Sequence, residues 1–250
     1  MSKDKSMYNS GDYALKNPGW HKEDAKWKAD KIITLIRADF IKQLAPEVDL
    51  IDIGCGTGEI LKRVSDYFKI KDIQVNPIGY DLSQEIIDQA KRSFPQGSFY
   101  SAVFDKQSYK KQTGISIALL IDILEHIQDP AALLKDVRES CDYVICHLPL
   151  EDNFEVNLRG KKSHFTNTVG HIKFYSKKSA LGLFKDCGFN VRNMVYTCSD
   201  VSADYKLKSL PRRLIAQPLR KFFFKYFPQF TASILGNCSL MVLLEPDAKI

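Results

Sequence analysis

Several patterns that would assign a chain to a common class are missing from this sequence. None of its six cysteines forms a Cys-x-x-Cys pair, so the spacing indicates neither a zinc site nor a thioredoxin-like redox motif. The first residues, MSKDKSMYNSGDY, are polar, and no run of 18 apolar residues occurs anywhere. These absences disfavour a signal peptide and a membrane span. We therefore expect a cytoplasmic, reducing location, no metal and no spanning helix.

Internal repeats, low-complexity tracts and linkers between domains are also missing. With 250 residues, 44% of them apolar, the chain is long enough for one large domain with a sizeable core. We divide it into an N-terminal flap and helix (1–45) and a main domain (46–250) with insertions at 150–175 and 199–237. The 36 basic and 30 acidic side chains give a net charge of +6, which is compatible with an anionic partner but does not require nucleic acid.

The chain is organised around the stretch Val48–Val64, which reads VDLIDIGCGTGEILKRV. Its apolar start predicts a buried strand, and its end changes to helical spacing. Between them, Gly54, Gly56 and Gly58 stand at alternate positions. Glycine lets the backbone turn sharply and approach a ligand closely. A helix that opens at about Glu59 would direct its free N–H groups and positive dipole end at that ligand.

The spacing of the glycines separates two kinds of nucleotide site. A dinucleotide fingerprint needs Gly-x-Gly-x-x-Gly, but here the third glycine comes one residue early, and Glu59 stands where that pattern needs glycine. The pattern Asp52-x-Gly54-x-Gly56-x-Gly58 instead resembles motif I of the class I S-adenosylmethionine (SAM) dependent methyltransferases. The alternative is an ordinary strand-to-helix turn.

Carboxylates follow the next two predicted strands. Asp81 ends the strand Ile73–Tyr80 and lies 23 residues beyond Gly58. A carboxylate there can accept hydrogen bonds from both ribose hydroxyls of a nucleoside, which is the second element of the resemblance. Asp105 ends the strand Ser98–Phe104, where the family often has an acidic residue that meets the adenine amino group. Both aspartates have simpler alternatives, a turn residue for the first and a solvated loop residue for the second.

The fourth predicted strand, Ile115–Ile121, leads into Asp122-Ile-Leu-Glu-His and then Asp-Pro. This run is similar to the family's aspartate, Leu-Glu-His and Asp-Pro helix start, and Asp129 and Pro130 suit the N-cap and the first helical position. Ser116 stands where the family usually has a mainly structural aspartate. That departure bears on the strand and not on the cofactor site.

The resemblance implies an α/β, doubly wound, Rossmann-like sheet of seven mostly parallel strands with helices on both faces. The family inserts the last strand, here Ser239–Leu244, antiparallel between the fifth, Tyr143–Leu148, and the sixth, Phe189–Cys198. SAM is the implied cofactor, with Leu82 packed on adenine. The implied cofactor-binding set is Asp52, Gly54, Cys55, Gly56, Gly58, Asp81, Leu82, Asp105 and Asp122.

The reaction that the resemblance implies is methyl transfer by in-line displacement. No Asn-Pro-Pro-Tyr type tetrapeptide follows the fourth strand, which favours a small or lipid-linked acceptor over nucleic acid. Neutral histidine suits proton removal near pH 7, so His126 and His171 are the candidate bases, each with a structural alternative. Two rival functions remain open: a NAD-type oxidoreductase, and a non-catalytic SAM-binding or membrane-surface module.

Two further segments carry both a structural and a functional interpretation. A helix is predicted from Glu23 to about Leu44, and the tryptophans Trp20 and Trp27 either anchor it to the sheet or form a flap over the cofactor. Residues 206–227 combine basic side chains with Leu219, Phe222, Phe223 and Tyr226 at helical spacing. This pattern fits either a helix that caps the substrate cleft or a short helix that contacts a membrane surface.

Overall fold

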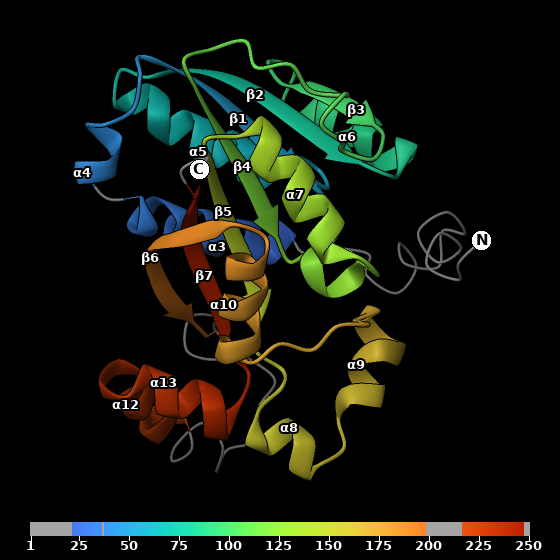
Figure 1. Cartoon of the computed structure of the whole chain (residues 1–250), viewed down its shortest axis with the longest axis vertical. Helices are drawn as coiled ribbons and strands as arrows, with labels where there is room; N and C mark the ends of the chain where they lie inside the picture. Colours follow the sequence, from blue (N-terminus) through green and yellow to red (C-terminus); the bar gives the residue numbers. More distant parts are fainter. Residues whose placement is uncertain (1–21, 37, 199–216, 248–250) are drawn as a thin grey trace.

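The computed structural model describes residues 22–36, 38–198 and 217–247. Its centre is a seven-stranded sheet with strand order β3-β2-β1-β4-β5-β7-β6 (Figure 1). All neighbouring strands are parallel except β7, which lies antiparallel between β5 and β6. The predicted topology, including the position of the last strand, is confirmed.

The strands alternate with helices along most of the chain. The strands are β1 Glu47–Ile53, β2 Gln74–Asp81, β3 Ser98–Ser101, β4 Ile115–Ile121, β5 Tyr143–Pro149, β6 Phe189–Thr197 and β7 Ser239–Pro246. The helices before β5 are α3 Lys22–Leu35, α4 Ala38–Ile41, α5 Glu59–Ile70, α6 Gln84–Ser93, the 3-10 turn η1 Leu124–His126 and α7 Pro130–Ser140. Those after β5 are α8 Phe154–Leu158, α9 Lys162–Val169, α10 Lys177–Asp186, α12 Gln217–Tyr226, α13 Pro228–Phe230 and the π-turn η3 Thr231–Leu235.

The sheet is buried on both faces, because successive strand residues point to opposite sides. Leu50 and Leu119 belong to one apolar core, and their neighbours Ile51 and Leu120 belong to the other. The first core contains side chains of α3, α5 and α6, and the second contains side chains of α7 and α10. The sheet is therefore doubly wound, as predicted.

Several helix ends have the caps that the sequence indicates. The Ser83 hydroxyl accepts from the Ile86 N–H at the start of α6, and the Asp129 carboxylate accepts from the Ala132 N–H at the start of α7. Such caps satisfy backbone donors that have no partner within the helix. The fourth strand forms as predicted despite Ser116, whose N–H and hydroxyl both contact the Asp142 carboxylate.

The structure differs from the sequence expectations in three places. The single helix predicted from Glu23 to about Leu44 is two helices, α3 and α4. The third strand stops at Ser101, and the loop beyond it buries Phe104 and Tyr109 against the sheet instead of extending the ladder. The predicted polar connection 150–175 contains α8 and α9, each too short to be recognised by apolar periodicity.

The insertions gather beyond the carboxyl end of β5, where α8, α9, α12 and α13 lie together at one end of the molecule (Figure 1). The Leu150 N–H donates to the Cys238 carbonyl, which ties the first insertion to the start of β7. The flap before residue 22 and the part of the second insertion at 199–216 lie outside the described residues. Within the described ranges, no helix combines the length and apolar character needed to span a bilayer.

Candidate functional site

The three motif glycines all adopt the left-handed backbone conformation, with φ of 80° at Gly54, 51° at Gly56 and 75° at Gly58. The turn is held against β2, because the N–H groups of Gly54 and Cys55 both donate to the Tyr80 carbonyl at 2.8 and 3.0 Å. Residues with a Cβ adopt this conformation at a cost of roughly 1–2 kcal/mol each. The geometry explains why three glycines occur here in succession.

The glycines differ in what a side chain would meet. A Cβ at Gly54 would lie 2.9 Å from Ile123 Cδ1, and one at Gly58 would lie 2.9 Å from Phe99 Cζ. A Cβ at Gly56 would have no protein atom within 4 Å. Gly54 and Gly58 are therefore required by internal packing, whereas Gly56 exposes its backbone to open space that a ligand can approach.

Asp81 joins the turn to the next strand. Its Oδ2 accepts from the Gly56 N–H at 3.1 Å, and its Oδ1 accepts from the Ser83 N–H at 3.0 Å. A carboxylate has about four acceptor positions, so Asp81 can still accept from a ligand hydroxyl. Burial raises the pKa of Asp81, and the backbone N–H groups of Ser83, Gly56 and Leu82 reduce that rise without cancelling it.

Asp52 lies directly before the turn and is 2% exposed. Burial, together with the negative charge of Asp81, raises its pKa to about 7. Two carboxyl groups thus face the same small region beside the open backbone of Gly56. A ligand that carries positive charge would stabilise their ionised forms, because an opposite charge within a few ångströms lowers a carboxyl pKa.

The remaining predicted cofactor residues fall into two groups. Cys55 is buried, and Leu82 is 45% exposed beside Asp81, where it can cover a planar ring. Asp105 is exposed, and its Oδ1 accepts from the N–H groups of Gln107 and Ser108 at 2.8 and 2.7 Å. Its carboxylate therefore caps its own turn, in agreement with the loop alternative considered from the sequence.

Asp122 is held by two partners, a lysine and a histidine. Its Oδ2 lies 2.7 Å from Lys28 Nζ of α3, and its Oδ1 lies 2.5 Å from His147 Nδ1 of β5. Burial by itself would raise the pKa of Asp122, but His147 and Lys28 outweigh burial and hold the pKa below its usual range. His147 Nε2 in turn meets the Thr197 hydroxyl at 2.8 Å.

The sequence analysis missed Lys28 and His147 as residues of this site. Lys28 lies on the predicted N-terminal helix, and no local pattern shows that the helix crosses the carboxyl ends of β4 and β5. Trp27 lies beside it, with its ring edge-on to His147 at 6.0 Å between centroids. This contact is consistent with the interpretation that Trp27 anchors the helix to the sheet. Trp20 lies outside the described residues.

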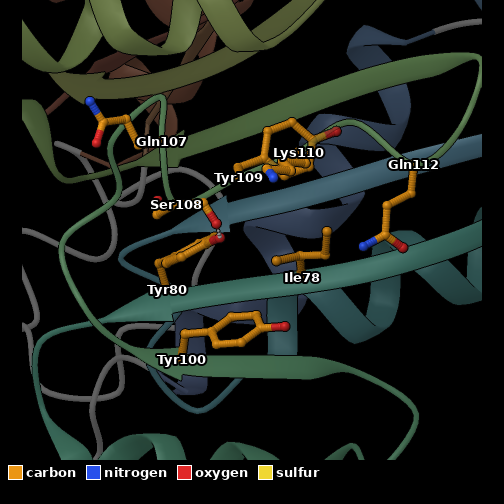
Figure 2. Close-up of a pocket in the computed structure, with 8 residues that line it drawn as sticks. All are labelled: Ile78, Tyr80, Tyr100, Gln107, Ser108, Tyr109, Lys110 and Gln112. Carbon is orange, nitrogen blue, oxygen red and sulfur yellow. Dashed lines mark hydrogen bonds between the residues drawn. The ribbon is translucent and has the colours of Figure 1, made fainter.

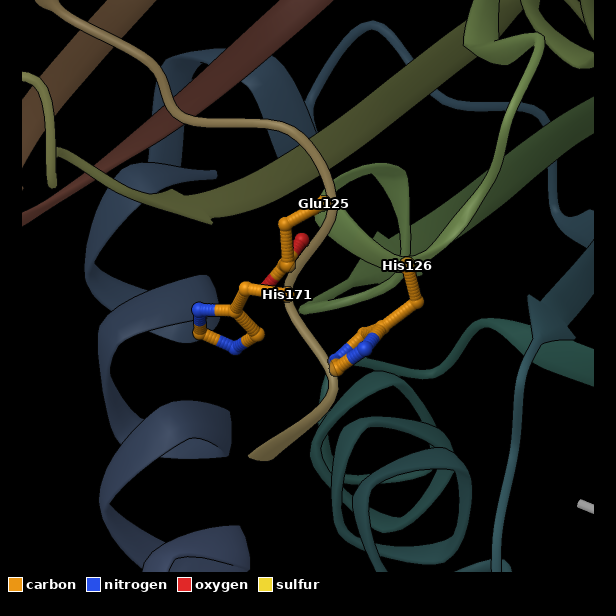
Figure 3. Close-up of side chains that lie close together, drawn as sticks. All are labelled: Glu125, His126 and His171. Carbon is orange, nitrogen blue, oxygen red and sulfur yellow. The ribbon is translucent and has the colours of Figure 1, made fainter. Parts of the chain in front are cut away.

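The two candidate bases come together although they are 45 residues apart in the sequence. The rings of His126 and His171 lie 4.8 Å apart, edge to face. His171 Nδ1 is 2.7 Å from Glu151 Oε2, and the Glu125 carboxylate lies close to both histidines (Figure 3). The Glu125 carbonyl accepts from the N–H groups of Ile172 and Lys173, and these bonds hold the His171 segment against η1.

A separate pocket lies on the β2–β3 side of the sheet (Figure 2). Tyr80, Tyr100 and Ser108 line it, with the Tyr80 hydroxyl donating to the Ser108 carbonyl. Its volume of about 230 Å³ is below the 300–1,000 Å³ typical of ligand pockets. None of the motif glycines lines it, so we assign the functional site to the glycine turn and not to this pocket.

Comparison with known proteins agrees with this geometry. A family model described as a methyltransferase domain matches residues 20–193. The plantazolicin methyltransferase BpumL, solved with a desmethylPZN analog and SAH, is 14% identical with a TM-score of 0.62 over 98% of this chain and 94% of that one. A search of curated proteins found no match.

Two further solved structures share the fold over nearly the full length. Magnesium protoporphyrin IX methyltransferase (ChlM) from Synechocystis PCC 6803, with bound SAH, is 13% identical, with a TM-score of 0.59 and coverage of 98% of both chains. A putative methyltransferase in complex with the Haloferax volcanii Trm112 activator is 13% identical, with a TM-score of 0.59 and coverage of 99% of both chains.

The family match spans more than half of the chain, so the chain belongs to the methyltransferase domain family. With the seven-stranded sheet and its antiparallel β7, it is a class I SAM-dependent methyltransferase. The resemblance stated from the sequence is thereby confirmed at the level of family, fold and cofactor.

Proposed function

We propose that this methyltransferase transfers the methyl group of SAM to a hydroxyl or amine of a small or lipid-linked acceptor by in-line displacement. The observation that carries the proposal is the open backbone at Gly56, held in place by the Asp81 carboxylate. SAM supplies a methyl group already activated on a sulfonium. The protein therefore has to align donor and acceptor and exclude water.

On the cofactor side, we assign the glycine turn to the amino-acid part of SAM and Asp81 to the ribose hydroxyls. Asp52 supports this assignment, because its buried carboxyl beside Asp81 is complementary to a ligand with ammonium and sulfonium charges. Leu82 would cover one face of the adenine. Asp105 would contact the adenine only if its carboxylate left its own turn.

On the acceptor side, we assign His126 and His171 to removal of the acceptor proton. Their position supports this assignment. The two rings contact each other at the carboxyl end of the sheet, and the neighbouring Ile123 side chain packs on Gly54 of the glycine turn. The contact between His171 and Glu151 orients the ring. Asp122 is engaged by Lys28 and His147, so we give it a part in shaping the site.

The decisive experiment uses SAM with a tritiated methyl group and fractionated cell extract. We expect one fraction of small molecules or lipids to take up label only when the enzyme is present. Calorimetry with SAM and with NADH is run beside it. Binding of NADH alone would contradict the proposal in favour of an oxidoreductase, and binding of SAM without labelling of any fraction would favour a non-catalytic module.

A lipid-linked acceptor is favoured by the surface of α12 and α13. Leu219, Phe222, Tyr226, Phe227 and Phe230 are each about half exposed there, with Lys221 and Lys225 on the same helix. Exposed aromatic side chains beside basic ones suit the interface of an anionic membrane. We therefore propose that the enzyme works in the cytoplasm at a membrane surface. Among the described residues, no disulfide joins any of the six cysteines, which is consistent with a reducing compartment.

Vesicle co-sedimentation tests this surface. We expect binding to vesicles of anionic phospholipid and at least a tenfold loss for the double variant Phe222→Ser/Tyr226→Ser. The control is Ile70→Ser, which removes a 76% exposed side chain at the end of α5. Equal binding by all three proteins would contradict the membrane contact and leave the cleft-capping alternative.

A further inference from the structure

Three side chains with metal-binding chemistry meet beside η1. One carboxylate oxygen of Glu125 and one ring nitrogen each of His126 and His171 all lie within 4.8 Å of one another. Figure 3 shows them converging from two segments, η1 and the irregular segment between α9 and α10. The set offers two imidazole nitrogens and one carboxylate.

Glu125 is 1% exposed, and no other described residue forms a hydrogen bond with either of its carboxylate oxygens. Lys28, whose charge acts on Glu125, is already paired with Asp122. A buried carboxylate without a partner is costly by several kcal/mol, so such a group is paired, binds a metal or takes up a proton. Burial, Asp122 and Glu151 raise the pKa of Glu125, so a proton satisfies this group when no cation is bound.

The two histidines have the outer contacts that fix metal ligands. His171 Nδ1 is 2.7 Å from Glu151 Oε2, and His126 Nδ1 is 3.2 Å from the Gly170 carbonyl. A histidine that donates its Nδ1–H to a carboxylate or a carbonyl keeps its lone pair on Nε2, which is the usual arrangement around a bound metal. Both rings therefore have one nitrogen oriented by the protein and the other suited to coordination.

We propose that Glu125, His126 and His171 bind one divalent transition-metal cation of the zinc or manganese class. Mixed imidazole and carboxylate ligands favour these ions over magnesium and calcium, which prefer oxygen ligands alone. Donor atoms in a tetrahedral zinc site lie roughly 3.3 Å apart, given metal–ligand distances of about 2.0–2.1 Å. The ligand atoms of the three side chains now lie within 4.8 Å of one another, so the side chains have to rotate when the metal binds to bring these atoms to this spacing.

We assign the cation to activation of the acceptor hydroxyl. This role rests on the proposed function, whereas metal binding itself does not. Three protein ligands leave at least one coordination position for a hydroxyl oxygen of the acceptor. The cation lowers the pKa of that hydroxyl, and its proton passes to water. The oxygen lone pair then forms the bond to the methyl carbon, while the carbon–sulfur bond breaks and sulfur keeps the electron pair. His126 and His171 would then act as metal ligands and not as bases, and water would take the proton.

Metal binding is tested directly on the full chain. The protein is treated with EDTA and dialysed against Zn²⁺ or Mn²⁺, and bound metal is counted by mass spectrometry. We expect about one equivalent per chain, with binding at least tenfold weaker in Glu125→Gln and in His171→Ala. The matched control is His164→Ala, which removes an exposed histidine of α9 and keeps full binding. In Glu151→Ala, loss of the outer contact with His171 would lower affinity about 10–100-fold.

Calorimetry with SAM on the same variants separates this proposal from the proposed function. Retained SAM affinity in Glu125→Gln, with metal binding lost, supports the site and shows that the fold persists. Absence of bound metal in the unmodified chain, or full binding in both ligand variants, would overturn it. Should a variant fail to fold, Mn²⁺ is added to the unmodified protein while the ring signals of its histidines are recorded by NMR. Selective broadening at His126 and His171, but not at His164, supports the site, and its absence overturns it.

Discussion

The substitution Gly56→Ala tests whether the backbone at this position contacts SAM, because the added methyl group disturbs little else in the turn. Gly56 has φ of 51°, and a Cβ there meets no protein atom within 4 Å. Alanine therefore costs only the conformational term, roughly 1 kcal/mol. For a chain of this size that cost corresponds to a fall in melting temperature of about 2–4 °C.

The effect on SAM is much larger. The new methyl group would occupy space that we assign to the ligand, and overpacking of this kind costs about 1–3 kcal/mol. We therefore expect Gly56→Ala to bind SAM about 5–150-fold more weakly. Titration calorimetry measures the affinity, and differential scanning calorimetry measures the stability of the same preparation.

Gly160 provides a matched control. Its φ is 60°, and a Cβ there also meets nothing within 4 Å, but it lies between α8 and α9. Gly160→Ala should lose the same stability and keep its SAM affinity. Unchanged affinity in Gly56→Ala would refute the assignment of this backbone to the cofactor. A fall in stability well beyond that of Gly160→Ala would show that the new methyl group at residue 56 clashes with the protein, and would contradict the open space beside Gly56.

Three further predictions concern packing and charge. Gly58→Ala should lose more stability than Gly56→Ala by about 1–3 kcal/mol, measured by urea unfolding, because its Cβ meets Phe99 at 2.9 Å. Lys28→Met should lower the free energy of unfolding by about 2 kcal/mol, because it removes one cation from the half-buried Asp122, which keeps His147; a change below 1 kcal/mol would contradict this account of the ion pair. The pKa of Asp52 is about 7 in the folded protein, above its value of 3.8 in the unfolded chain. Between these two values the folded state holds a proton that the unfolded state has lost. The contribution of Asp52 to the free energy of unfolding therefore falls as the pH rises from about 4 to 7. The stability of Asp52→Asn relative to the unmodified protein should therefore grow through this window by an amount on the order of 4 kcal/mol and stay level above it; a difference independent of pH, in urea unfolding at pH 4, 6 and 8, would contradict the raised pKa.

The sequence by itself determined the frame of this protein. Runs of apolar residues such as Ile115–Ile121, which is buried along almost its whole length, are visible in the local sequence, so the apolar pattern identified the strands. The glycine turn and Asp81 were also predictable, because parallel strands place their carboxyl ends at one edge of the sheet, and these residues follow adjacent strands. Local chemistry likewise identified the caps Ser83 and Asp129.

Tertiary structure alone decided which groups meet across the site. Lys28, Asp122 and His147 come from α3, the end of β4 and β5, and no local pattern records a contact between segments so far apart. The same holds for Glu125 and His171, which packing brings together across the first insertion. Strand and turn signals depend mainly on neighbouring residues and can be read from them. Charge pairing and the convergence of Glu125 with His171 depend on distances that exist only after the chain has folded.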